Sequence, residues 1–151
     1  MREVDRELLV SRALEKSAEA MQTAKLNLDN DLLSSAQNRI YYGIFYAVNA
    51  LAYKYGFITS KHGQLLSWFN KKFIHEDKVF DKELFKIYKY NFDNRQKSDY
   101  DFIYQPVKED VELSYQDGMY FIDVIKKYLL KWFYVLILCK FINLVTIVTK
   151  Y

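Results

Sequence analysis

Arg95 and Asp99 stand four residues apart, which places both side chains on the same face of a helix. Their neighbours at helical spacing are apolar or aromatic, so we expect the pair on an inward-facing stripe. A guanidinium in such a place has to be paired and hydrogen-bonded, because removing it from water is costly. Two interpretations fit. Either Asp99 holds Arg95 in a structural ion pair, or Asp99 orients Arg95 toward a bound phosphate.

His62 is the candidate for proton transfer, since an imidazole titrates near neutral pH. It opens an expected helix, where it either packs as a first-turn residue or reaches Arg95 together with Lys61. His75 lies in an acidic turn and is expected on the surface. The two histidines fall on different sides of one helix, and Cys139 is the single cysteine, so no metal site and no cofactor are expected.

Asn38 and Arg39 also have two interpretations. They either cross-link helices and pair with acids, or they add donors to an anion pocket with Arg95. Three aromatic side chains follow them at helical spacing, namely Tyr42, Phe45 and Tyr46. Such rings stack on nucleobases, but they also pack in cores and in dimer interfaces.

Helical periodicity positions all of these residues. The chain has four glycines and one proline, which are too few turn residues for a β-sandwich or barrel. The sequence therefore predicts an all-α fold, an up-and-down bundle of about five helices. We expect helices at about 3–28 and 32–55, a third that is capped by Thr59 or Ser60 and ends at about 73, and two more at 81–102 and 111–129. Phe102 lies on the expected inward-facing stripe of the fourth helix.

The expected helix over 32–55 has two faces that avoid charge. Ile40, Ile44 and Leu51 lie on an aliphatic stripe, and Tyr42 and Phe45 lie roughly opposite. No acidic residue occurs between Leu32 and Tyr55. We expect its own bundle to cover one face and a two-fold mate to cover the other, as in a symmetric homodimer.

Charge is unevenly distributed. The three lysines after Leu129 account for the whole formal charge of +3, so the body of the chain is neutral. A neutral body argues against a broad surface for duplex nucleic acid, but it leaves room for a local phosphate pocket. The charged N-terminus is unlike a secretory signal, and together with the single cysteine this favours a cytoplasmic location.

The stretch 129–149 is nearly all apolar, and its length suits one membrane span. Lys140 and Asn143 fall inside it, and both disfavour insertion. Three interpretations stay open: a weak membrane anchor, a helix or strand that covers an oligomer interface, or a segment without a selected role. We place the helical domain at 1–130 and treat 131–151 as an extension.

Three separated motifs resemble the HEPN superfamily of small helical proteins. They are Asn38-Arg39-Ile40-Tyr41-Tyr42-Gly43-Ile44-Phe45-Tyr46-Ala47, Lys61-His62-Gly63 and Arg95-x-x-x-Asp99-Tyr100. The resemblance extends from about Leu8 to Leu130. It implies a bundle of four to five helices that usually dimerises and is often encoded beside a minimal nucleotidyltransferase.

Many HEPN proteins are metal-independent ribonucleases with an arginine followed four to six residues later by histidine. The arginine would be Arg95, but Tyr100, Asp101 and Phe102 occupy the positions of the histidine. Tyrosine, with an ordinary pKa of about 10, is a poor proton acceptor at neutral pH. Either the activity is lost, or His62 serves instead.

The resemblance therefore suggests a component of a two-gene, toxin–antitoxin-like HEPN/nucleotidyltransferase module. RNA or a nucleotide would bind at a pocket centred on Arg95, with ligand contacts from Asn38, Arg39, Tyr42, Lys61, Asp99 and Tyr100. The alternative is a non-catalytic dimerisation or binding module in which the Arg95–Asp99 pair is structural.

Overall fold

The computed structural model describes residues 3–148, and within that range the chain is helical with no strand. The elements are α1 (Glu3–Asp29), α2 (Leu33–Lys54), α3 (His62–Phe69), the π-helical segment η1 (Asn70–Glu76), α4 (Lys82–Tyr100) and α5 (Lys108–Val148). The expectation of an all-α bundle of about five helices is confirmed.

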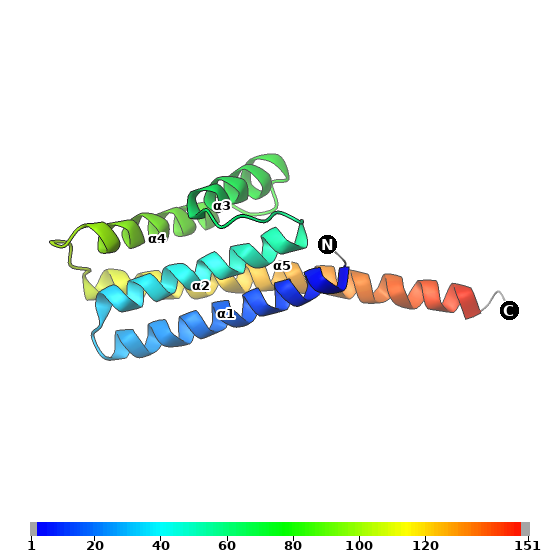
Figure 1. The fold of residues 1–151 in the computed structure, drawn as a ribbon, viewed down its shortest axis with the longest axis horizontal. Coiled ribbons are helices and arrows are strands. Elements are labelled where there is room, and N and C mark those ends of the chain that lie inside the picture. Colours follow the sequence, from blue (N-terminus) through cyan, green and yellow to red (C-terminus); the bar gives the residue numbers. More distant parts are fainter. Residues whose placement is uncertain (1–2, 149–151) are drawn as a thin grey trace.

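Helix α2 is the centre of the bundle. It packs against α1 and α5, and also against α3 and α4 (Figure 1). Its aliphatic stripe, including Ile40, Ile44 and Leu51, is fully buried. On another face Tyr41 is also fully buried, with its ring beside those of Tyr88 and Phe92 from α4. Phe45 and Asn49, from the face that the sequence assigned to a dimer partner, are buried as well, so the same chain covers part of that face.

Two glycines allow the central helices to approach closely. A Cβ atom on Gly43 of α2 would lie 2.5 Å from Sδ of Met21 in α1. A Cβ atom on Gly118 of α5 would lie 3.1 Å from Cγ2 of Ile40. The α1–α2 contact is reinforced by Ser17, whose buried hydroxyl donates to the Gly43 carbonyl oxygen at 2.7 Å. Small residues at these positions bring α1 and α5 against α2.

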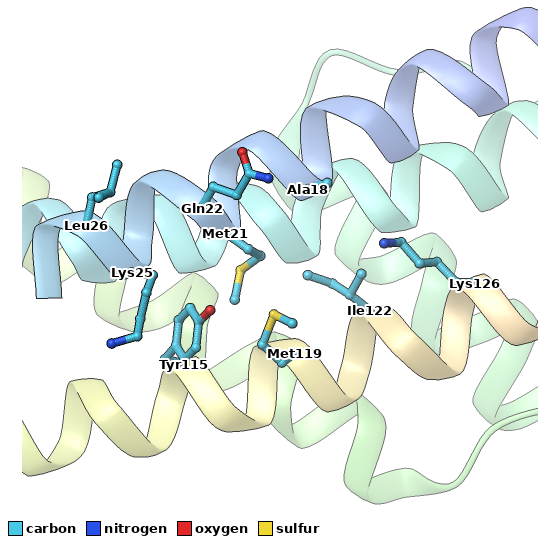
Figure 2. Close-up of a pocket in the computed structure, with 9 residues that line it drawn as sticks. All are labelled: Ala18, Met21, Gln22, Lys25, Leu26, Tyr115, Met119, Ile122 and Lys126. Carbon is cyan, nitrogen blue, oxygen red and sulfur yellow. The ribbon is translucent and has the colours of Figure 1, made fainter. Parts of the chain in front are cut away.

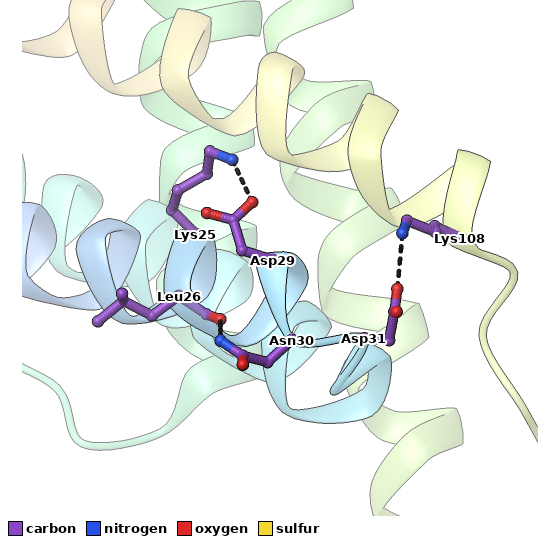
Figure 3. A network of polar contacts seen from close by, with 6 residues as sticks. All are labelled: Lys25, Leu26, Asp29, Asn30, Asp31 and Lys108. Carbon is purple, nitrogen blue, oxygen red and sulfur yellow. Dashed lines mark hydrogen bonds and ion pairs between the residues drawn. The ribbon is translucent and has the colours of Figure 1, made fainter.

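Polar contacts fix the turn between α1 and α2 (Figure 3). Asn30 Nδ2 donates to the carbonyl oxygen of Leu26 at 2.8 Å, and Lys25 pairs with Asp29. Asp31 adopts a φ of 57°, a left-handed conformation that aspartate tolerates better than most residues. Its carboxylate lies 2.6 Å from Lys108 Nζ, which joins the turn to the first residue of α5.

Helix ends agree in part with the sequence signals. Gly56 has a φ of 70° directly after α2, and Asp81 accepts a hydrogen bond from the Glu83 amide at 3.3 Å as the cap of α4. The sequence predicted Thr59 or Ser60 as the cap of the third helix, and this prediction is wrong by one residue or more. Lys61 precedes α3, while Thr59 accepts from the Lys61 amide at 3.1 Å.

The stripe of α4 that was predicted to face inward is buried only in the first half of the helix. Leu84 and Tyr88 are buried as predicted. The prediction for Phe102 is wrong, because α4 ends at Tyr100 and the Phe102 side chain is fully exposed. The helix has run past the bundle at this end, so the periodic pattern no longer has anything to pack against.

Helix α5 continues without a break from the bundle into the apolar stretch, and its last part projects beyond the other helices in Figure 1. Leu129 is fully buried and Phe133 packs against the core, whereas Tyr134 is exposed. Within the described chain no helix has both the length and the apolar character that a membrane crossing requires. The side chains of Lys140 and Asn143, which bear on this question, lie outside what the structure describes.

We predict that residues after Lys131 are dispensable for folding. A chain that ends at Lys131 should stay helical and melt cooperatively, because the buried residues of α1 to α5 up to Leu129 are kept. It should be less stable than a chain ending at Tyr134 by about 1–3 kcal/mol, since the second chain retains Phe133. Circular dichroism measures the helical content, and urea unfolding measures the difference in stability. An unfolded or aggregated Lys131 chain would place the extension in the core.

Candidate functional site

The side chains of Tyr41, His62 and Arg95 lie together where α2, α3 and α4 meet. The Tyr41 hydroxyl lies 2.6 Å from Nδ1 of His62, the first residue of α3. A terminal guanidinium nitrogen of Arg95 lies 3.4 Å from the same Nδ1. The structure thus brings His62 and Arg95 together, which the sequence offered as one of two interpretations of His62.

A second set of hydrogen bonds holds the end of α4 against α2. The Ser98 hydroxyl donates to Oε1 of Gln37 at 2.8 Å, and Gln37 Nε2 donates to the Tyr104 hydroxyl at 3.3 Å. Gln37 is buried on α2. Because Ser98 lies between Arg95 and Asp99 along α4, this contact sets where both charged side chains stand.

The Arg95–Asp99 pair lies at the rim of the bundle. Nε of Arg95 is 3.1 Å from Asp99 Oδ2, and the two side chains are 22% and 34% exposed. Nε is itself buried but makes no aligned hydrogen bond with any described residue. The expectation of a fully inward-facing pair is therefore wrong. Near its C-terminus α4 leaves the cover of the other helices, which admits water to both groups.

Aromatic rings form the floor under Arg95. Its guanidinium carbon is 5.3 Å from the centroid of the Tyr41 ring and 5.6 Å from that of Tyr42. These faces attract the cation and keep its position. The guanidinium therefore has a fixed base, one carboxylate beside it and N–H groups that remain available to an anion.

His62 is held as a neutral ring. It stacks on Phe45 with 4.2 Å between ring centroids and 9° between planes. Burial, and secondarily the positive charge of Arg95, lower the pKa of His62 below its ordinary value. Burial also raises the pKa of Tyr41 far above its ordinary value, against the opposing effect of Arg95, so Tyr41 keeps its proton.

The tautomer of His62 follows from these contacts. An arginine N–H can only donate, so the Arg95 contact requires Nδ1 to accept; the Tyr41 hydroxyl then donates to the same nitrogen and the ring proton resides on Nε2. The nitrogen that Tyr41 leaves available is then an N–H donor. A donor suits an anionic ligand, whereas a general base for ribonuclease chemistry needs an unprotonated nitrogen facing the substrate.

Asn38 and Arg39 stand next to this group. Nη2 of Arg39 donates to Asn38 Oδ1 at 2.7 Å, and the guanidinium lies 4.8 Å from the centroid of the Tyr42 ring. Asn38, Arg39 and Asp99 line one shallow polar hollow, with Ser98. Arg39 and Arg95 thus both contact the Tyr42 ring.

Two predicted ligand contacts are placed elsewhere. Lys61 is exposed and directly precedes α3, apart from the polar contacts that Arg95 makes. Tyr100 is 82% exposed and borders a different shallow hollow with Asp93, Gln96 and Lys97. The structure thus brings together Asn38, Arg39, Tyr42, His62, Arg95 and Asp99, but not Lys61 or Tyr100.

The sequence reasoning missed Tyr41, Phe45 as a partner of His62, and Gln37. One signal was available, because Gln37, Tyr41 and Phe45 are spaced by four residues and so share a face of α2. Among the described residues no group of three His, Cys, Asp or Glu side chains is placed to hold a metal ion.

A separate groove lies between α1 and α5, away from this site (Figure 2). The side chains of Met21 and Met119 point toward one another across it, and Lys25 and Lys126 stand along its edges. Its lining is mainly aliphatic and thioether, and no histidine or arginine borders it. It offers packing space but not the convergent polar groups of the Arg95 site.

Comparisons with known proteins agree with the fold. A model of the HEPN domain matches residues 10–128. A protein of Thermotoga maritima named "UPF0332 protein" is 37% identical over 123 residues, covering 82% of this chain and 92% of the relative. A protein of Methanocaldococcus jannaschii named "Putative toxin MJ0142" is 37% identical over 121 residues, covering 80% of this chain and 82% of that protein. A second one from that organism, "Putative toxin MJ0605", is 28% identical over 119 residues, covering 78% and 87%.

We predict that His62 titrates below pH 6.5 and that Arg95→Gln raises its pKa, because the variant removes a nearby positive charge. The unfolded chain binds this proton more readily, so stability should decrease as pH falls below about 6.5, and less so in Arg95→Gln. NMR titration of the imidazole resonances, assigned with His75→Gln, measures the pKa. A midpoint that Arg95→Gln leaves unchanged would refute the contact.

Proposed function

This chain belongs to the HEPN domain family, and on that premise we propose that it is the HEPN component of a two-gene HEPN/nucleotidyltransferase module of toxin–antitoxin character. In this proposal it binds RNA or a nucleotide through a phosphate at Arg95. The observation that carries the binding part is the convergence of Arg95 and neutral His62 on one half-exposed rim.

The chemistry of that rim fits a phosphate. The Arg95 guanidinium supplies charge and N–H donors in a planar fork, and one of its terminal nitrogens faces the acceptor Nδ1 of His62. Arg39 places a second guanidinium against the Tyr42 ring. Asp99 lies against Nε of Arg95, so it orients the fork without occupying the terminal nitrogens.

The module part of the proposal has other support. Two relatives carry names that describe toxins. The nucleotidyltransferase partner rests on the family resemblance of the three motifs. A minimal nucleotidyltransferase reading frame beside the gene for this chain would support it.

Binding without cleavage is the form that we favour. Tyr100 stands where the family's ribonucleases have histidine, and its side chain is 82% exposed and away from Arg95. His62 is close to Arg95, but Tyr41 engages its acceptor nitrogen. The site therefore has donors for a phosphate and lacks a placed base for the 2′-hydroxyl.

The second candidate function is a non-catalytic dimerisation or binding module in which Arg95 is purely structural. One observation favours it, since Arg95 already has Asp99 beside it and two tyrosine rings beneath it. The two functions differ in what the loss of Arg95 does. A structural role predicts a loss of stability, and a binding role predicts a loss of affinity.

We predict that Arg95→Ala abolishes binding of a short single-stranded RNA while the melting temperature falls by only a few degrees. The stability cost should be about 0.2–1 kcal/mol, because the ion pair is partly exposed to water. Fluorescence anisotropy at fixed salt measures binding. Lys86→Ala is the matched control, since it removes an exposed, paired cation from the same helix.

Two results would contradict this. Unchanged RNA binding in Arg95→Ala would remove the site, and a stability loss of about 3–5 kcal/mol that Asp99→Ala partly restores would favour the structural function. The unaltered protein should show no metal-independent RNA cleavage above background. Robust cleavage that His62→Ala eliminates would make His62 a catalytic base.

We also propose a symmetric homodimer, although α2 leaves less surface for its interface than the sequence predicted. Beyond its exposed first turn at Ser34 and Ser35, α2 keeps a partly buried stripe that includes Arg39 and Tyr42. A second copy placed over this stripe would bring two Arg95 sites near each other.

We predict that the chain ending at Lys131 sediments as a dimer at tens of micromolar, about the range in which a weak specific interface shows. Sedimentation velocity over a concentration series measures this. Arg39→Glu should weaken the dimer, because two-fold symmetry would place two buried carboxylates at the interface. A monomer throughout the series would reject the proposal.

A further inference from the structure

A cavity lies between α1 and α2 and is closed at one end by the segment that leads to α3. Its volume is about 550 Å³, within the range of small-molecule sites. Its wall on α2 is mainly aromatic and its wall on α1 carries two cations. The lining residues that matter here are Tyr42, Tyr46, Asn49, Tyr53, Arg12 and Lys16.

This cavity adjoins the Arg95 site. His62 and Tyr42 line the cavity, and the same two residues contact Arg95. A group bound at Arg95 therefore lies at one end of the cavity, and whatever is covalently attached to that group can extend into it.

The lining distinguishes among occupants. No carboxylate lines the cavity, and Lys16 Nζ lies 5.6 Å from the centroid of the Tyr46 ring. Asn49 is buried, and its Nδ2 donates to the Phe45 carbonyl oxygen at 2.9 Å. That bond fixes the amide and leaves Oδ1 as an acceptor. Tyrosine and serine hydroxyls add donors.

A planar ring with polar edges fits this combination better than an apolar helix does. Aromatic faces stack on nucleobases regardless of sequence, and an amide and hydroxyls can meet the edge of a base. An apolar partner helix would instead bury Arg12 and Lys16. The Met21–Met119 groove has the aliphatic lining that such a helix requires, and the cavity does not.

We propose that this aromatic cavity binds the nucleobase of the nucleotide whose phosphate is held by Arg95. The inference rests on the proposed function and names its ligand as a nucleotide unit, either free or within single-stranded RNA. Tyr46 is the stacking platform, Asn49 faces the edge of the base, and the two cations on α1 lie toward the next phosphate.

The test compares AMP with ribose 5-phosphate on the full chain, by NMR titration. AMP should bind about 10-fold more tightly, as one stacked base provides. Tyr46→Ala should reduce AMP affinity to that of ribose 5-phosphate and leave ribose 5-phosphate binding unchanged. Tyr46→Phe keeps the ring and should retain the preference. Tyr120→Ala, which removes an exposed tyrosine from α5, is the control.

The outcomes separate this inference from the proposed function. Equal affinity for AMP and ribose 5-phosphate, both lost in Arg95→Ala, would overturn the base site and leave the phosphate site standing. Binding of neither compound nor of RNA would overturn both. Loss of the preference for AMP in Tyr46→Phe would also overturn the assignment, since that variant keeps the stacking surface.

A further arm distinguishes the source of the nucleotide. A short single-stranded RNA should bind more tightly than AMP if the α1 cations contact a second phosphate, because AMP has only one. Arg12→Ala together with Lys16→Ala should then weaken RNA binding and not AMP binding. Equal effects on both would identify a free nucleotide as the ligand.

Discussion

Helix α2 packs against four other helices, and each polar side chain that it buries there has to find a partner. Tyr41 meets this requirement through His62, Gln37 through Ser98 and Tyr104, and Asn49 through the Phe45 carbonyl oxygen. These bonds attach the start of α3 and the end of α4 to the central helix. The candidate site is the place where those attachments meet.

The same requirement decides the protonation of the site. Because the buried Tyr41 hydroxyl must donate, His62 must accept at Nδ1 and keep its proton on Nε2. The nearby guanidinium opposes a second positive charge on the ring. The nitrogen of His62 that faces Arg95 and Tyr41 is therefore engaged as an acceptor and is not free to act as a base. This is the physical ground for separating anion binding from RNA cleavage in this chain.

The energetics of Arg95 also follow from its position. A buried pair would have to offset the loss of hydration for both ions, and removing one partner would be severely destabilising. At 22% and 34% exposure the two side chains keep part of their hydration, so the pair contributes little to stability. Keeping the Arg95 cation at the rim costs little stability, and a carboxylate and two rings orient it. Arg95 is therefore well placed to bind an external anion.

Sequence alone determined the helical class, most helix positions and the pairing of Arg95 with Asp99, because these depend on periodicity over a few turns of one chain segment. It also singled out His62 by residue type, without deciding its partner. Only the tertiary structure decided that Tyr41 holds His62, that Tyr100 lies apart, and that Phe102 is exposed. Those outcomes depend on where separate helices cross and end, which local spacing does not contain.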